Sequence, residues 1–295
     1  RRRRQVLMRE PAALDRAGLV RRAAQELAAA GVDDPRGTAE TLWARAAGAS
    51  RRAIALRAQD AVPAAAAARF ANWVRRHATG EPLAYLEGSC EFFGLELEVD
   101  ARVLVPRADS EALVECALEF LPASASGLIA DLGTGSGCLL LAVLHVRPAL
   151  HGLGVDLGAG ALEVARKNSA RLGLSARAHF VRCDWLEAVS GRLAAVLANP
   201  PYVVPGEELG PGVAAFEPHL ALFTPRGEPL APYRRILARA CSVLAPGGIL
   251  LFEVGAGRAD EVSAGATAAG WQEVARRRDL GGVERALAFR WPAAG

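Results

Sequence analysis

The chain has 295 residues, of which 52% are hydrophobic and 23% are charged, and its formal net charge is +3. This composition is typical of a globular protein with a sizeable core, and it excludes disorder as the main character of the chain. No apolar run approaches the roughly 18 residues of a membrane span, and the cysteines and histidines show no disulfide or metal-ligand spacing, so we expect a reduced, metal-free, cytoplasmic protein without a secretory signal.

The N-terminal segment, residues 1–82, is predicted to form a small helical bundle. Its apolar residues recur at helical spacing, as at Leu19, Ala23 and Leu27. Residues 1–80 carry 16 arginines and 7 acidic residues, a balance of +9, which leaves 19 basic and 25 acidic residues, or −6, for the rest. This basic charge favours either an anionic partner, such as RNA or an acidic protein, or a solvated helical face.

A β-hairpin is predicted within residues 83–105, as a link between two domains. Leu95, Leu97 and Val99 alternate with acidic residues, which is the period of a strand, and Gly94 marks the turn. A C-terminal domain, residues 106–295, is then expected to begin with a helix at Ser110–Leu121, capped at its N-terminus by Asp109 or Ser110.

Short apolar strands and helices alternate through the rest of the chain. We expect strands at Gly127–Leu132, Gly152–Asp156, His179–Cys183, Ala194–Ala198 and Gly248–Val254, helices at Cys138–Val146, Gly160–Leu172 and Tyr233–Leu244, and two closing strands at Trp271–Arg278 and Ala286–Trp291. This order predicts an α/β fold with a mostly parallel sheet and helices on both faces. Ligands of such sheets bind beyond the C-terminal ends of the strands.

A glycine-rich turn follows the first of these strands and opens a helix. Its residues are Asp131, Leu132, Gly133, Thr134, Gly135, Ser136 and Gly137. The glycines permit a tight turn and close approach of a ligand, but the pattern is neither that of dinucleotide enzymes nor that of a phosphate-binding loop. The acidic Asp131 suits a cationic cofactor, and Asp156 at the end of the next strand suits ribose hydroxyls. Together they favour S-adenosylmethionine, the alternative being a turn without a ligand.

Asp184 and Trp185 follow the third strand. An acid and an aromatic ring there could hydrogen-bond and stack an adenine, although Trp185 could equally be a core residue.

The tetrapeptide Asn199-Pro200-Pro201-Tyr202 follows the fourth strand. The prolines have no N–H, so the loop presents carbonyl acceptors beside the side-chain oxygen of Asn199. Two fixed acceptors match the two hydrogens of a planar –NH₂ group, on which Tyr202 can stack. We therefore predict that Asn199, Pro200 and Tyr202 hold an amide or amino nitrogen for methyl transfer, with Pro201 also contacting the substrate and Asn199 also reaching the cofactor. The alternative is an ordinary proline-rich turn.

These residues together resemble the PrmC/HemK family of protein-(glutamine-N5) methyltransferases. The resemblance also covers Gly80–Gly88, Glu91–Gly94, Pro106–Glu111, Phe216–Pro218 and the Asp279…Glu284-Arg285 tail. It implies a Rossmann-like class I S-adenosylmethionine-dependent methyltransferase domain that modifies the glutamine of the Gly-Gly-Gln motif in class 1 peptide chain release factors, with the helical domain docking the factor. It further implies that Phe92 lies near the cofactor and that Arg107 contributes to substrate binding.

The chain departs from the family pattern at two places, which puts the details of the loop at 222–229 in doubt but not the cofactor site. Ala108 replaces a usual proline, and the segment 222–229 differs from the family's glycine-rich form. A related activity on a ribosomal-protein glutamine, a nucleic-acid amino (adenine-N6-type) methyltransferase and an inert cofactor-binding protein are the remaining readings. The acidic Glu207, Glu208 and Glu217 near the tetrapeptide argue against a phosphate backbone there, and hence against direct nucleic-acid binding.

Overall fold

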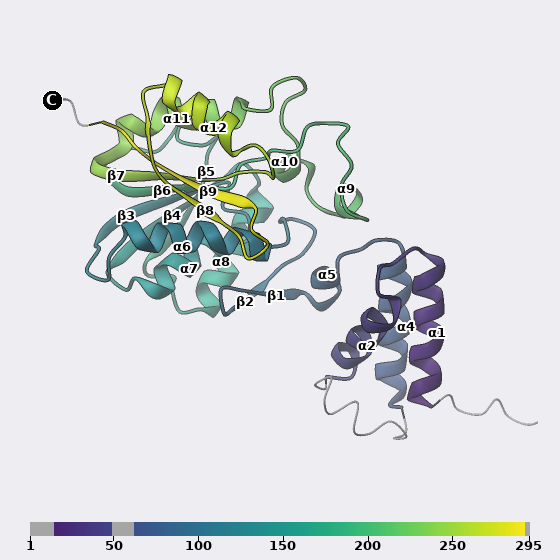
Figure 1. Cartoon of the computed structure of the whole chain (residues 1–295). Coiled ribbons are helices and arrows are strands. Elements are labelled where there is room, and N and C mark those ends of the chain that lie inside the picture. The colour runs from purple at the N-terminus through teal and green to yellow at the C-terminus, as the bar shows by residue number, and fades with distance from the viewer. Residues whose placement is uncertain (1–14, 49–61, 293–295) are drawn as a thin grey trace, which may run out of the picture. The chain divides into compact units, whose positions relative to one another are not determined.

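The computed structural model describes residues 15–48 and 62–292, and the chain forms two compact units, residues 1–87 and 88–295. Figure 1 colours the whole chain by residue number, from purple at the N-terminus to yellow at the C-terminus, so the first unit is purple to blue and the second runs on to yellow. Residues 1–14 and 49–61 of the predicted helical domain lie outside the described residues. None of the helices in the described ranges is long and apolar enough to cross a membrane.

The first unit is a helical bundle, as predicted. It contains α1 (Arg16–Ala29), α2 (Pro35–Ala46), α4 (Ala64–Ala78) and the short α5 (Leu83–Glu87). The side chain of Asp15 caps α1 by accepting from the backbone N–H of Gly18, and Asp34 caps α2 from Gly37 in the same way. The apolar faces meet around Trp43 and Phe70, whose rings pack edge to face with centroids 5.3 Å apart.

The second unit begins with the predicted hairpin, β1 (Ser89–Phe92) and β2 (Leu95–Glu98), which pair antiparallel. Phe93 and Gly94 form its turn with φ of +51° and +72°. The hairpin packs by Phe92, Leu95 and Leu97 into the larger core rather than standing free.

The remainder is the predicted α/β fold. Its strands are β3 (Gly127–Leu132), β4 (Leu150–Asp156), β5 (Ala178–Arg182), β6 (Leu193–Ala198), β7 (Leu244–Glu253), β8 (Gln272–Arg278) and β9 (Glu284–Arg290). They form one sheet in the order β5-β4-β3-β6-β7-β9-β8, parallel except for β9, which is antiparallel to both neighbours. The order reverses between β3 and β6, so the ligand crevice is expected beyond the ends of those strands.

Helices cover both faces of this sheet (Figure 1). One face carries α6 (Glu111–Phe120), α7 (Cys138–Val146) and α8 (Ala159–Arg171), and the other carries α11 (Ala231–Val243) and α12 (Ala259–Ala268). Two clusters of buried aliphatic and aromatic side chains, one on each side, fill the space between layers. Two single-turn helices that the sequence did not predict, α9 (Val213–Phe216) and α10 (His219–Leu222), lie between β6 and α11.

The start of α6 differs from the prediction. A short 3₁₀ turn, η1 (Ala108–Ser110), precedes it, and neither Asp109 nor Ser110 caps it with a side-chain hydrogen bond. Tertiary partners take these side chains instead: Asp109 accepts from Arg285 at 2.7 Å, and Ser110 turns toward Asn199. The local capping rule is thus overridden by contacts with β9 and with the end of β6.

Candidate active site

The glycine-rich turn is fixed to the neighbouring strand. Gly133, Gly135 and Gly137 have φ of +71°, +54° and +83°, which side chains with a Cβ rarely adopt. The backbone N–H groups of Gly133 and Thr134 both donate to the carbonyl of Val155 in β4, at 2.8 and 2.9 Å. These hydrogen bonds hold the turn between β3 and α7 in one conformation before any ligand binds.

Asp156, at the end of β4, joins two backbone turns. One of its carboxylate oxygens accepts from the N–H of Gly135 at 3.0 Å, and the other accepts from Gly158 at 2.8 Å. Burial raises the pKa of this carboxyl, and the backbone donors act in the opposite direction. Each oxygen has a second lone pair, so the side chain can still accept from a ligand.

Asp131 lies beneath the turn rather than on its surface. Its side chain accepts from the Thr134 hydroxyl at 2.7 Å through one oxygen, while the other oxygen is buried without a partner. Burial raises the pKa of Asp131 to about 7. An acid in this position stiffens the turn and places negative potential under it.

Asp184 and Trp185 follow β5. One oxygen of Asp184 accepts from Arg235 of α11 at 2.7 Å, and its other oxygen is buried without a partner. Trp185 has the left-handed φ of +48°, and its ring lies 3.6 Å from where a Cβ on Gly133 would be. This separation is an ordinary van der Waals contact, so the φ of +71° at Gly133, rather than crowding by Trp185, favours glycine at this position.

The tetrapeptide follows β6, beside the turn. Asn199 donates through Nδ2 to the Ser110 hydroxyl at 3.4 Å. Pro200 is buried, and the ring of Tyr202 packs so closely against Gly255 that a Cβ there would come within 2.8 Å of it. Burial raises the pKa of the Tyr202 phenol, which keeps it neutral.

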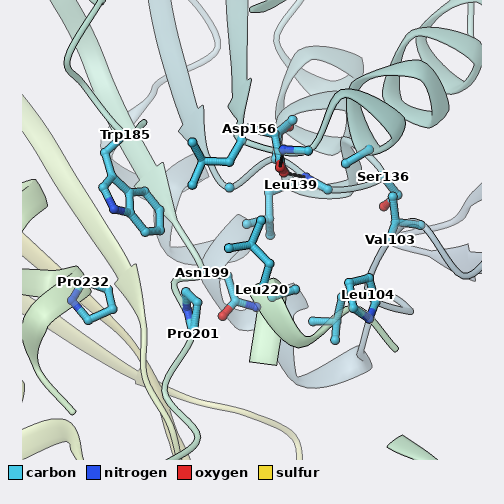
Figure 2. Close-up of a pocket in the computed structure, with 18 of the residues that line it drawn as sticks. Val103, Leu104, Ser136, Leu139, Asp156, Trp185, Asn199, Pro201, Leu220 and Pro232 are labelled. Atoms are coloured by element: carbon cyan, nitrogen blue, oxygen red, sulfur yellow. Dashed lines mark hydrogen bonds between the residues drawn. The ribbon is translucent and has the colours of Figure 1, made fainter. Parts of the chain in front are cut away.

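One cavity of about 560 Å³ joins these features, a size typical of small-molecule sites. Figure 2 shows Asp156, Trp185, Asn199 and Pro201 around it, together with Leu220. Of the residues predicted to bind cofactor or substrate, its lining contains Gly133, Thr134, Gly135, Ser136, Asp156, Asp184, Trp185, Asn199, Pro201 and Arg107.

Comparisons with known proteins show which family this chain belongs to. A model of the PrmC N-terminal domain matches residues 18–88, and a model of the methyltransferase small domain matches residues 109–214. A release factor glutamine methyltransferase from Cereibacter sphaeroides is 39% identical over 94% of this chain and 99% of the relative. A release factor glutamine methyltransferase from Rhodospirillum rubrum is 38% identical over 97% of this chain and 88% of the relative. The chain belongs to the release factor glutamine methyltransferase family.

A solved structure adds a further likeness. It is a release factor-specific protein-(glutamine-N5) methyltransferase from Alicyclobacillus acidocaldarius and is 29% identical to this chain. The match covers 66% of this chain and 100% of that chain, with a TM-score of 0.40. The family membership rests on the sequence relatives.

Several residues predicted for the site do not line the cavity. Phe92 is 2% exposed and is absent from the lining, because it belongs to the same buried apolar cluster as side chains of α6 and α7. The lining also does not include Asp131, Gly137, Pro200 or Tyr202. The turns that form the site were predicted from the sequence, but the side chains that face the cavity were not.

The three arginines of the lining are all engaged by carboxylates. Arg102 pairs with Asp100 and Glu163, and Arg235 pairs with Asp184 and Glu187. Arg107, predicted to bind substrate, donates to the fully buried Glu217, which also accepts from the backbone N–H of Val105 at 3.0 Å. The described cavity therefore offers little positive charge for a polyphosphate.

One wall of the cavity, and one buried carboxyl group behind it, were not predicted from the sequence. Leu220 of α10 and, from the atypical segment 222–229, Phe223 and Thr224 line the cavity. Backbone hydrogen bonds from Val203 to Leu222 and from Thr224 to Val203 hold this part of the chain. Glu253, at the end of β7, is 2% exposed beside the tetrapeptide. The sequence does show an acidic residue at the end of an apolar strand, which could have marked Glu253 as a candidate. Its neighbours in space are distant in the sequence, so its place beside the tetrapeptide could not be predicted.

Proposed function

We propose that this protein transfers a methyl group from S-adenosylmethionine to the side-chain amide nitrogen of the glutamine in the Gly-Gly-Gln motif of class 1 peptide chain release factors. Family membership supports the activity. The observation that carries the proposal to this chain's own residues is that Asn199 and Pro201 line the same cavity as the glycine-rich turn, Asp156 and Trp185.

The residues present fit S-adenosylmethionine. Asp184 has a buried carboxylate oxygen without a partner, which suits an amino group, and Trp185 offers an aromatic face beside it. Asp156 has acceptor capacity for ribose hydroxyls, and the open glycine turn over Asp131 suits a cationic methionine end. When bound, this cofactor supplies an electrophilic methyl group on a positively charged sulfur and leaves as S-adenosyl-L-homocysteine.

The chain's task is to hold the glutamine amide. Asn199, which lines the cavity, accepts one amide hydrogen through its side-chain oxygen. We assign the second acceptor to the backbone carbonyl of Pro200, which is buried next to the lining in the ligand-free chain and must become accessible when the substrate binds. These bonds return electron density to a nitrogen whose lone pair is otherwise delocalised, and they fix its direction of attack. The ring of Tyr202 packs against Gly255 and does not line the cavity, so we assign it to supporting the loop rather than to stacking on the amide. The nitrogen gains the methyl group and gives up one of its two protons to water.

We also assign the first 82 residues to docking of the release factor, residues 83–105 to the link and residues 106–295 to catalysis. The excess of positive charge in the first segment supports a docking role. A substrate that acts in translation supports our assignment of the enzyme to the cytoplasm. No group of three or more metal-ligating side chains gathers anywhere in residues 15–48 and 62–292, and the reaction as proposed uses none.

Radiolabelled S-adenosylmethionine and purified release factor test the proposal. The factor is supplied intact and as a copy whose motif glutamine is replaced by alanine. We expect label only in the intact factor. Label in both factors, or label in neither with transfer to a ribosomal protein or to nucleic acid, would overturn the proposed substrate.

A further inference from the structure

Glu253 and Asn199 end neighbouring strands. β6 and β7 are parallel with Ala198 opposite Phe252, so the next residue on each strand lies at the same edge of the sheet. Asn199 lines the cavity, whereas Glu253 is buried behind it, 2% exposed. Burying a carboxyl group is costly, so its retention at this edge needs a reason.

Ser110 lies beside both side chains. It is 3% exposed and accepts from Asn199 Nδ2 at 3.4 Å. Hydrogen bonding by the Ser110 hydroxyl and by the Asn199 amide lowers the pKa of the Glu253 carboxyl group, so both groups are within its reach. The second oxygen of Glu253, Oε2, is buried without a partner. The carboxyl group is therefore held at one end and has unused acceptor capacity at the other.

The direction of these hydrogen bonds depends on the ionised carboxylate. A carboxylate only accepts, so the Ser110 hydroxyl must point its hydrogen at Glu253 and keep its lone pairs for Asn199. The Asn199 amide then presents Nδ2 to Ser110 and turns its oxygen toward the cavity. A protonated Glu253 can donate to Ser110 and allow the opposite arrangement, with the Asn199 nitrogen toward the substrate.

We propose that Glu253 is a positioning residue that, through Ser110, keeps the side-chain oxygen of Asn199 turned toward the substrate glutamine. This role rests on the proposed function, because it concerns the acceptor that holds the amide. Glu253 itself touches neither substrate nor cofactor in this arrangement.

The surroundings of Glu253 set the pH range of the effect. Arg285 from β9 favours its ionised form, Asp109 from η1 disfavours it, and the neutral Tyr202, Tyr233 and Cys138 also face it. Burial dominates and raises the pKa of Glu253 to about 7. The rate of transfer should therefore rise with pH through about 7 as the carboxylate forms.

The test compares Glu253→Gln with the wild-type enzyme and with Glu115→Gln, a change at an exposed glutamate of α6. Glutamine keeps the shape but can donate to Ser110 as well as accept, so it no longer sets the direction. We expect kcat to fall about 10-fold or more, equivalent to one lost directional hydrogen bond. The rise near pH 7 should disappear, while the Kd for S-adenosylmethionine stays within about twofold, because Glu253 lies outside the cavity.

Ser110→Ala provides a second route if Glu253→Gln folds poorly. It should cause a similar loss of kcat and of the pH dependence, and the double variant should lose little more than either single one. A Glu253→Gln enzyme with the wild-type kcat and pH profile, or additive losses in the double variant, would overturn the proposal. Failure of the proposed function is distinguishable, since the wild-type enzyme would then not label the glutamine.

Discussion

Replacing Asp156 by asparagine should weaken cofactor binding by a predictable amount. Its two carboxylate oxygens accept from Gly135 and Gly158 at 3.0 and 2.8 Å. Asparagine has one acceptor oxygen, so its NH₂ group must face one of these two N–H donors. A hydrogen bond to a charged group contributes about 1.5–3 kcal/mol, which corresponds to about 10- to 150-fold in affinity if the turn must reorganise on binding.

Titration calorimetry with S-adenosylmethionine measures this loss directly. The matched control is Asp33→Asn, an exposed aspartate of the helical unit, which should bind as the wild type does. Thermal unfolding of each variant shows that the fold is kept. An Asp156→Asn enzyme that is folded and binds the cofactor within twofold of wild type would refute the claim that Asp156 organises the turn for its ligand.

Three further changes test other parts of the site. Asn199→Ala should lower the rate of transfer by about 100-fold or more, because one acceptor for the amide is lost; equal losses of transfer and of cofactor affinity, measured side by side, would contradict the separate roles. Arg107→Ala should lower the free energy of unfolding, measured by urea titration, by about 1–3 kcal/mol, because the buried Glu217 loses its partner. The effect is limited because Arg107 is partly exposed. An unchanged urea midpoint would show that the ion pair does not stabilise the fold. Glu253→Gln should raise the free energy of unfolding at pH 7.5 by up to about 3 kcal/mol and leave it unchanged near pH 4. The sign follows because the native pKa of about 7 exceeds the unfolded value of 4.5, so wild-type stability falls as pH rises between them; a variant with the same slope in that window would contradict the assignment.

The placement of elements followed from local patterns. Alternation at Leu95 and Leu97, the glycines at 133 and 135 and the apolar run of β6 indicate strands and turns by themselves, because strand periodicity and positive φ are local properties. The ends of the strands were harder to predict than their positions. β7 begins at Leu244 rather than at the predicted Gly248, because pairing with β6 extends it.

By itself, the sequence determined the alternation of strands and helices, the glycine-rich turn and the acceptor-rich tetrapeptide, because each depends on residues close together in the chain. Only the tertiary structure decided which of those side chains reach the cavity. Phe92 turned into the core, and Arg107 paired with Glu217 across 110 residues. Ser110 and Glu253 meet Asn199 only because three segments end at one edge of the sheet, a contact that no local pattern encodes.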